Sequence, residues 1–177
     1  MEQKTGLVHI YCGDGKGKTT AALGMAVRAA GRGKRILIAR FLKTDDSGEV
    51  PVLGGIPGIR LIPCKRSFGF FSRMTETEKK EAGEYYNRLF HKAWREGVEE
   101  KFDMILLDEI MAACRYGLVP EAELLKCLRE KPDRLEVVMT GRDPSEALLN
   151  AADYVSEVCK RKHPYDRGVT AREGIEY

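Results

Sequence analysis

The sequence lacks several features that would place it in a specialised class of protein. No apolar run approaches the roughly 20 residues needed to span a membrane, and the first residues (MEQKT) lack the apolar core of a secretion signal. The five cysteines are odd in number and none pair at the spacing of metal ligands, which argues against a disulfide framework or a zinc site. We therefore expect a protein of the reducing cytoplasm that has no membrane partner.

The chain also lacks a large excess of positive or of negative charge. Thirty lysines and arginines stand against 27 acidic residues, a formal net charge of +3, and the basic residues are scattered along the chain. This distribution is not that of a dedicated nucleic-acid-binding protein, so we expect no nucleic-acid partner, whereas a small polyanion would suit it. At 177 residues, 43% of them hydrophobic, the chain is long enough for one well-buried α/β domain and too short for two.

The feature around which the chain is organised is a glycine-rich loop at residues 13–20 (GDGKGKTT). It follows a short apolar run at 7–11 and precedes an alanine-rich segment at 21–30, an order that predicts strand, loop and helix. Glycines allow the loop to turn its N–H groups around an anion, and the helix start adds the positive end of its dipole. Lys18 supplies an ammonium for phosphate oxygens and Thr19 a hydroxyl for Mg²⁺. The loop therefore predicts a triphosphate site.

One position departs from the usual form of such a loop. The common pattern G-x-x-x-x-G-K-[ST] has glycine where this chain has Cys12. The alternative is a glycine-rich turn that joins a strand to a helix without binding a ligand. With Lys18 and Thr19 in register between the predicted strand and helix, phosphate binding is the favoured interpretation.

A second group of candidate residues ends a buried strand predicted over residues 102–109. Its last two residues are Asp108 and Glu109. In a nucleotide-binding α/β protein the strand that carries such acids lies beside the glycine loop, where a carboxylate holds Mg²⁺ directly or through water. The pattern leaves open which of the two acids does so, and the alternative is that they only cap the following turn. A third segment, residues 140–142 (TGR), also follows a predicted strand.

The remaining segments predict the fold class. Further strands are expected at 34–41, 59–62, 135–140 and 154–158, and the last of these is expected at a sheet edge. Helices are expected after the capping box at 75–78 (TETE), after Pro120, and after residues 143–146 (DPSE) with the proline in the first turn, whereas 42–63 is expected to be mostly loop. The alternation predicts a single α/β domain with a mainly parallel sheet and helices on both faces, as in P-loop NTPases of the RecA type.

An aromatic cluster lies between Arg66 and Arg73. Phe68, Phe70 and Phe71 follow neither a helical nor a strand period. Two interpretations stay open: the loop folds its phenylalanines onto the core, or they form an apolar floor for a large flat ligand.

These segments together resemble the P-loop type of ATP:corrinoid adenosyltransferase, the cob(I)alamin adenosyltransferases. The C-terminal tail is the most specific part of the resemblance, since generic P-loop enzymes lack it. The family usually has Asn at the position of Asp14, and it also lacks the first glycine of the common loop pattern, which accounts for Cys12. The matching segments are 13–22, 41–43, 48–49, 107–109, 140–142, 162–163, 168–169 and 174–177.

The resemblance implies a reaction in which Co(I) of a corrinoid such as cobalamin or cobinamide attacks the 5′-carbon of ATP. The whole triphosphate is expelled, in the synthesis or salvage of adenosylcobalamin. It implies ATP and the corrinoid as substrates, Mg²⁺ as cofactor, a flavoprotein reductase as electron donor and a homodimer. Co(I) has no proton to lose, so the attack needs no general base, whereas the departing triphosphate needs preorganised donors and cations.

The resemblance also assigns roles to residues of this sequence. Catalysis falls to Lys18, Thr19 and Glu109, and metal binding to Thr19, Glu109 and Asp108. Phe68 and Phe70 would displace the lower axial base of the corrinoid, and the tail at 159–177 would cover the active site. The residues expected to bind ATP or the corrinoid are Gly13, Asp14, Gly15, Lys16, Gly17, Lys18, Thr19, Thr20, Arg28, Phe68 and Phe70.

Two other functions fit the same residues. An ATP-dependent kinase or NTPase would need an acid to align a hydroxyl or water and an arginine on the phosphates, for which Glu109 and Arg142 are available. A non-catalytic module that senses ATP or carries a corrinoid would need only binding. Fold alone does not separate these functions.

Overall fold

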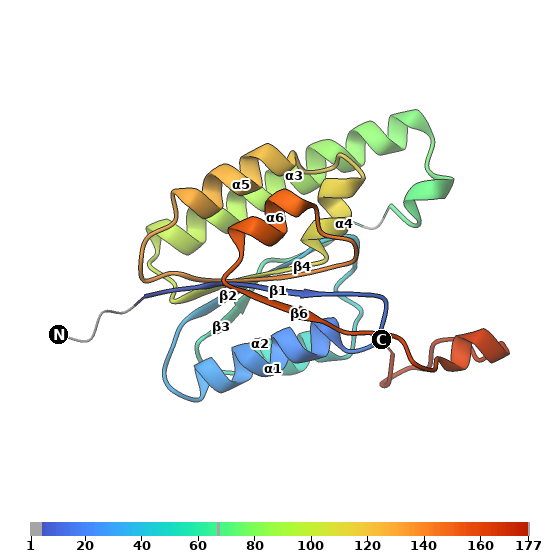
Figure 1. Ribbon diagram of the computed structural model, residues 1–177, viewed down its shortest axis with the longest axis horizontal. Coiled ribbons are helices and arrows are strands. Elements are labelled where there is room, and N and C mark those ends of the chain that lie inside the picture. The colour runs from blue at the N-terminus through green and yellow to red at the C-terminus, as the bar shows by residue number, and fades with distance from the viewer. Residues whose placement is uncertain (1–4, 67, 177) are drawn as a thin grey trace.

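A twisted parallel sheet forms the centre of the computed structural model, which describes residues 5–66 and 68–176 (Figure 1). Its strand order is β3-β2-β4-β5-β1-β6, and the neighbouring strands run parallel. This order confirms the mainly parallel sheet and places the last strand at an edge. The strands in the described part of the chain are β1 Val8–Cys12, β2 Ile36–Arg40, β3 Ile59–Leu61, β4 Met104–Asp108, β5 Glu136–Thr140 and β6 Tyr154–Glu157.

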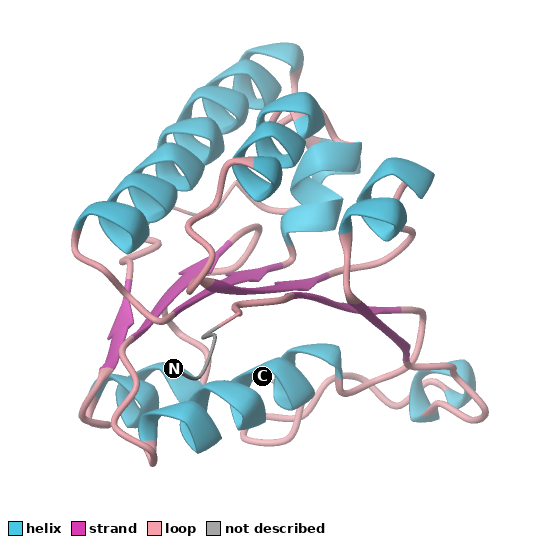
Figure 2. Cartoon of the chain, turned by 60° about the vertical axis from the view of Figure 1, so that its left-hand side comes forward, coloured by secondary structure: helices cyan, strands magenta, loops and turns pink. Residues whose placement is uncertain are grey.

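Helices cover both faces of the sheet, as Figure 2 shows. On one face, the alanine stripe of α1 packs on β2 and β4. The other face carries α3, the longest of the described helices, together with α4, α5 and α6, and the larger apolar cluster. The described helices are α1 Lys18–Ala30, α2 Glu49–Gly54, α3 Glu76–Glu99, α4 Ile110–Arg115, α5 Glu121–Arg129 and α6 Glu146–Ala151, with short 3₁₀ helices at Phe71–Arg73 and Pro164–Arg167.

The two central strands explain why the sheet needs both layers. Every residue of β2 (ILIAR) and β4 (MILLD) is buried, as expected for parallel strands covered on both faces. Each of these strands ends in a buried charged residue, Arg40 in β2 and Asp108 in β4. A buried charge requires a partner, so these carboxyl ends are where polar chemistry gathers.

Helix α3 confirms the capping box predicted at its start. Thr75 accepts a hydrogen bond from the Glu78 N–H, and the Glu78 side chain accepts one from the Thr75 N–H. The buried residues of α3 recur every three or four positions, as on one face of an amphipathic helix, and this face packs on the sheet. They are Ala82, Tyr86, Leu89, Phe90, Ala93 and Gly97. Within the described residues, none of the helices is long and apolar enough to cross a membrane.

Residues 42–63 are mostly loop, as predicted, but they also contain a short helix that was not anticipated from the sequence. Helix α2 forms there despite Pro51, because the proline lies in its first turn, where a backbone N–H has no partner within the helix. Leu53 anchors α2 to the core. A correction concerns α6, whose N-cap is Ser145, so that Pro144 precedes the helix instead of lying in its first turn. Helix α4 was not anticipated.

Candidate functional site

The glycine loop has the backbone that its sequence predicts. Gly13 and Gly17 adopt φ angles of 102° and 117°, in the left-handed region that glycine tolerates best. A Cβ at Gly13 would lie 2.5 Å from the Val158 carbonyl oxygen, so even without the unfavourable φ angle a side chain would not fit. The Gly15 N–H donates to the same carbonyl at 2.7 Å. The loop is thus held against the end of β6.

Lys18 is the most enclosed charged group of the loop. It begins α1 and is 7% exposed, and its Nζ donates to the Gly15 carbonyl at 2.8 Å across the loop. Burial, reinforced by the nearby Arg142 guanidinium, lowers the pKa of Lys18. A cation held under these conditions gains from an incoming anion, because phosphate oxygens would replace the solvation it has lost.

A chain of hydroxyls and a carboxylate lies behind Lys18. The Thr19 hydroxyl donates to Asp108 Oδ1 at 2.8 Å, and the Thr140 hydroxyl donates to the same oxygen at 2.6 Å. Asp108 has no exposed surface. In the sheet, β5 lies between β4 and β1, so these two strands are not neighbours, but the carboxyl end of β4 lies beside the glycine loop, as predicted. Asp108 reaches Thr19, because the start of α1 lies over these strand ends.

Glu109 occupies a strained position at the start of α4. Its backbone is left-handed, with φ 62° and ψ 24°, and its N–H donates to the Thr140 hydroxyl at 2.9 Å. Such a conformation costs a non-glycine residue about 1 kcal/mol or more. It turns the carboxyl group toward the cavity in front of the loop, where burial and then the neighbouring Asp108 raise the pKa of Glu109.

This raised pKa predicts how stability depends on pH. Between the ordinary value of 4.5 and the raised value, the folded state binds the proton more tightly than the unfolded chain does, so stability falls as pH rises. Glu109→Gln is therefore expected to raise the free energy of unfolding of the nucleotide-free protein at pH 8, where the wild-type carboxyl group is buried in its charged form. The gain should disappear below pH 4.5. Urea titrations at several pH values measure it, and a gain independent of pH would contradict this account.

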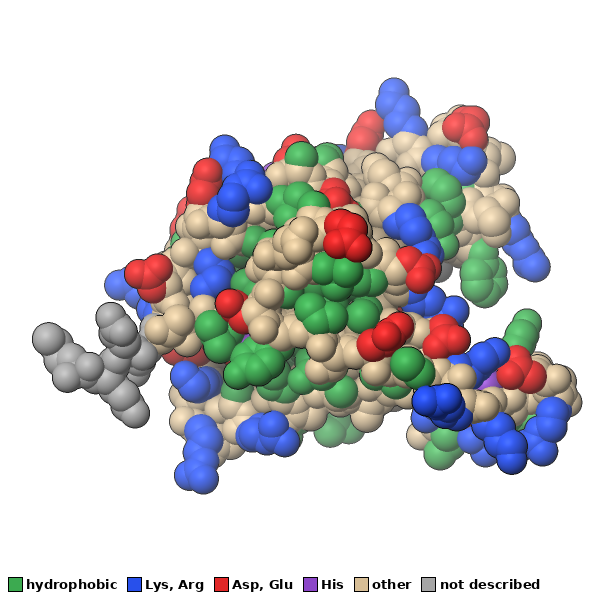
Figure 3. Space-filling view, viewed as in Figure 1, with side chains coloured by type: hydrophobic (Ala, Val, Ile, Leu, Met, Phe, Trp, Pro, Cys, Tyr) green, Lys and Arg blue, Asp and Glu red, His purple; other side chains and the backbone are tan. Residues whose placement is uncertain are grey.

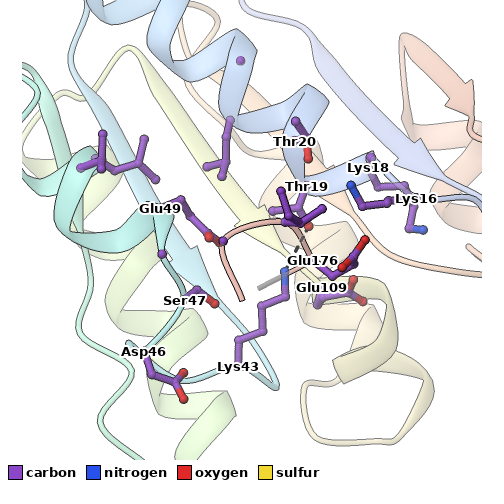
Figure 4. A pocket seen from close by; sticks show the side chains of 18 of the residues that line it. Lys16, Lys18, Thr19, Thr20, Lys43, Asp46, Ser47, Glu49, Glu109 and Glu176 are labelled. Atoms are coloured by element: carbon purple, nitrogen blue, oxygen red, sulfur yellow. Dashed lines mark hydrogen bonds between the residues drawn. The ribbon is translucent and has the colours of Figure 1, made fainter. Parts of the chain in front are cut away.

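A cavity of about 970 Å³ opens in front of the loop (Figure 4). Its volume is at the upper end of the range for ligand sites. Its wall combines the loop, one side of α1, the segment from Lys43 through α2, Glu109, Arg142 and part of the C-terminal tail. The tail residues are His163, Gly174, Ile175 and Glu176; Tyr177, part of the tail resemblance, lies outside the described residues. The Lys160 N–H donates to Asp14 Oδ1 at 2.8 Å, so the tail is hydrogen-bonded to the loop, and this bond lowers the pKa of Asp14.

Most of the residues expected to bind nucleotide line this cavity. Gly13 packs against Val158 and does not line the cavity. Arg28 is exposed in the last turn of α1, roughly 15 Å along the helix from Lys18, and lines a second cavity at the other end of the strands. The expected residues found in the wall are Asp14, Gly15, Lys16, Gly17, Lys18, Thr19, Thr20 and Glu109.

The three phenylalanines have different environments: Phe68 and Phe71 pack on other aromatic rings, whereas Phe70 is exposed and available to a ligand. Phe68 is half-buried and packs on Tyr85 and Tyr86, with ring centroids 5.7 and 5.8 Å away. Phe71 stacks on Tyr116 at 4.4 Å. Phe70 is 73% exposed. None of the three lines the cavity in front of the loop. The segment that carries them and the tail both extend past the carboxyl ends of the strands in Figure 1.

Lys43 lines the cavity, and no role in the site was assigned to it from the sequence. Lys43 belongs to a segment of the resemblance, yet only the structure shows that its Nζ donates to Thr19 and Asp108. The signal available in the sequence was its position directly after the buried strand that ends at Arg40. Carboxyl ends of parallel strands meet at one edge, so a lysine there belongs with the other candidates.

The donor set fits a hard divalent cation that arrives with phosphate. Within the described residues, no group of three or more His, Cys, Asp or Glu could hold a metal ion by itself. The Thr19 hydroxyl and the Asp108 carboxylate offer oxygen ligands side by side, and Mg²⁺ usually completes its shell with phosphate oxygens and water. The Lys43 ammonium bridges these same two groups, so positive charge is accommodated between them.

Comparison with known proteins agrees with this site. A family model described as ATP:corrinoid adenosyltransferase BtuR/CobO/CobP matches residues 4–177. The chain belongs to this family. Corrinoid adenosyltransferase of Escherichia coli K12 is 34% identical over 177 residues, covering 99% of this chain and 88% of that protein. Corrinoid adenosyltransferase CobA of Salmonella typhimurium LT2 is 33% identical over 181 residues, with the same coverage.

The corrinoid adenosyltransferase shares its fold with more distant solved structures. The cytoplasmic domain of EssC superposes with a TM-score of 0.56 at 13% identity, covering 96% of this chain and 34% of that one. A KaiC-like protein from Pyrococcus horikoshii OT3 gives a TM-score of 0.54 at 14% identity, covering 91% and 75%. At such low identity they show the fold alone, a parallel α/β sheet with helices on both faces. The enzyme is therefore an ATP:corrinoid adenosyltransferase on a P-loop fold.

Proposed function

We propose that this adenosyltransferase binds the triphosphate of ATP in the glycine loop and presents the 5′-carbon to Co(I) of a corrinoid. The 5′-deoxyadenosyl group moves to cobalt and the triphosphate leaves in one piece. The observation that carries the proposal is the buried Lys18 beside the Thr19–Asp108 pair, at the inner end of a cavity large enough for a nucleotide. The family supplies the two substrates, ATP and a corrinoid.

The chain's own contribution to the reaction is to stabilise the leaving group. The loop N–H groups and the start of α1 direct partial positive charge at the anion, and Lys18 adds a full charge in an enclosed setting. Arg142 lines the same cavity. Thr19 and Asp108 would hold Mg²⁺, with Glu109 beside them. When bound, the ion would neutralise charge that builds up on the departing triphosphate.

The nucleophile needs no activation by the protein. Co(I) carries no proton, so the enzyme requires no general base, and its remaining task is to hold cobalt and the 5′-carbon in line while excluding water. The tail borders the cavity and carries several basic side chains (Figure 3), namely Lys160, Arg161, Lys162, Arg167 and Arg172. We propose that residues 159–177 close over the bound substrates, completing a single domain of residues 1–177.

The corrinoid would meet the aromatic segment. Phe70 is exposed, with the Arg73 guanidinium 5.6 Å from the centre of its ring, and can contact a flat ligand. Phe68, in the same segment, is half-buried and has the Arg66 guanidinium 4.4 Å from the centre of its ring. We assign to Phe68 and Phe70 the displacement of the lower axial base, which makes cobalt easier to reduce. A flavoprotein reductase as electron donor, a homodimer and a cytoplasmic location complete the proposal.

Removing either aromatic ring is expected to separate ATP binding from reduction. Phe70→Ala and Phe68→Ala should leave the Kd for ATP within about twofold of wild type and slow transfer to cobalamin supplied as Co(II) by about tenfold, since an aromatic contact contributes on the order of 1 kcal/mol. Phe70→Leu is the matched control that keeps an apolar side chain. If both alanine variants retained full Co(II)-dependent activity, the assignment of these rings would be wrong.

A product assay separates this function from its competitors. The enzyme is incubated with ATP, Mg²⁺ and chemically reduced corrinoid, and the absorbance of a light-sensitive cobalt–carbon product is followed. Appearance of that product supports transfer. Because Arg142 and Glu109 face the same cavity, a kinase or NTPase is the second candidate, and it would release ADP or orthophosphate instead. Tight binding without turnover would indicate a corrinoid carrier.

A further inference from the structure

Lys43 lies where the phosphate site would hold its metal ion. Its Nζ is 3.1 Å from Thr19 Oγ1 and 2.7 Å from Asp108 Oδ2, and Figure 4 shows the side chain extended toward Thr19. The same hydroxyl and carboxylate are the oxygen ligands that fit Mg²⁺. An ammonium and a divalent cation cannot share this position, because like charges at contact distance repel strongly in a site shielded from water.

The backbone around Lys43 is fixed by contacts that point it at this position. Leu42 has φ 58°, a left-handed conformation that a branched side chain adopts only under constraint. The Cys64 thiol donates to the Lys43 carbonyl at 2.9 Å. The buried Arg40 donates to the Thr44 carbonyl at 3.0 Å and also pairs with Asp45. A strained turn followed by two anchored carbonyls directs Lys43 back across the strand ends.

Burial makes the lysine a required partner of the carboxylate. Asp108 is fully buried, and its carboxylate accepts hydrogen bonds from the Thr19 and Thr140 hydroxyls and from the Lys43 ammonium. Without a cation an ionised carboxylate in this setting is strongly disfavoured. The Lys43 side chain is 28% exposed and lines the cavity, so its flexible stem has space to move toward a bound phosphate.

We propose that Lys43 is a resident cation of the phosphate site with two positions. In the nucleotide-free enzyme its ammonium pairs with Asp108 and excludes free divalent ions. When the metal–ATP complex enters, the ammonium is displaced onto the triphosphate, where it becomes an additional cation for the leaving group. The second position depends on the proposed function, whereas the first does not. The metal ion therefore enters this site together with its nucleotide.

Binding of Mn²⁺ alone tests the first position. Nucleotide-free wild-type enzyme and Lys43→Met are titrated with Mn²⁺, and the free ion is followed by electron paramagnetic resonance. We expect Lys43→Met to bind one Mn²⁺ at least about tenfold more tightly than wild type, because the competing charge is gone and no other lysine or arginine in the described part of the chain pairs with Asp108. Lys43→Arg keeps the charge and should bind like wild type. Equal Mn²⁺ affinity in wild type and Lys43→Met would overturn the proposal.

Two further variants keep the test decisive. Thr19→Ala combined with Lys43→Met should remove the gained Mn²⁺ binding; if binding persists, the ion is elsewhere and the proposal fails. Lys43→Gln, which retains a neutral donor for Asp108, repeats the comparison if Lys43→Met does not fold. The gain should then again reach about tenfold over wild type.

Kinetics test the second position. At saturating Mg²⁺ and ATP, Lys43→Met should lower kcat for adenosyl transfer by about 10- to 100-fold, and Lys43→Arg should recover part of it. An unchanged kcat in Lys43→Met would overturn the second position alone. Absence of transfer by the wild-type enzyme would overturn the proposed function but leave the Mn²⁺ result standing.

Discussion

Replacing Lys18 with alanine is expected to lower kcat for adenosyl transfer by roughly 10³-fold or more. The ammonium is enclosed, held across the loop by the Gly15 carbonyl, and placed where the leaving triphosphate gathers negative charge. A charge in an enclosed site needs no reorientation during the reaction, so its loss affects the transition state more than the bound substrate. Single-turnover rates with pre-reduced corrinoid measure this step directly.

Lys16→Ala is the matched control. Lys16 belongs to the same loop and lines the same cavity, but it is exposed and therefore screened by water. Its loss should reduce kcat only a few-fold. A Lys18→Ala enzyme that remained folded, as judged by circular dichroism, and kept its rate within tenfold of wild type would show that the loop is not the site of the leaving group.

Asp108→Asn is expected to have the second largest effect, a fall in kcat of about 10²-fold together with a higher Mg²⁺ requirement. The substitution keeps shape and volume but removes the charge that pairs with Lys43 and would face the metal ion. The new amide would also present N–H donors to a site where Thr19, Thr140 and Lys43 already donate. The variant should therefore melt at a lower temperature as well.

The control for this variant is Asp46→Asn. Asp46 is an exposed acid in the wall of the same cavity. The identical chemical change there should alter kcat and the Mg²⁺ requirement by no more than a few-fold. Initial rates over a Mg²⁺ titration compare both variants, and similar behaviour of the two would contradict the role given to Asp108.

Local patterns predicted the parts of the site that are contiguous in the chain. The loop, the helix after it and the pair formed by Asp108 at the end of β4 and Glu109 after it each follow from a few neighbouring residues and their spacing. The α/β class followed in the same way, because alternating strands and helices admit few arrangements. The short helix α2 escaped prediction because the glycines and prolines around it are also typical of loops.

Contacts between distant residues were beyond the reach of these patterns. Lys43 lies 65 residues from Asp108, and Thr19 lies 89 residues away. Only the order of the strands brings the three together. Arg28 shows the opposite relation between sequence and space: it is close to the loop in sequence, but α1 carries it to the second cavity, away from the loop.

The form in which phosphate leaves tests the central claim most directly. Enzyme, ATP, Mg²⁺ and excess Co(I) corrinoid are allowed to react in the dark, and ³¹P NMR spectra are recorded beside the corrinoid absorbance. We predict one tripolyphosphate for each cobalt–carbon bond formed. Formation of ADP or orthophosphate in step with the alkylated corrinoid, or phosphate release without it, would contradict an intact triphosphate leaving from the loop.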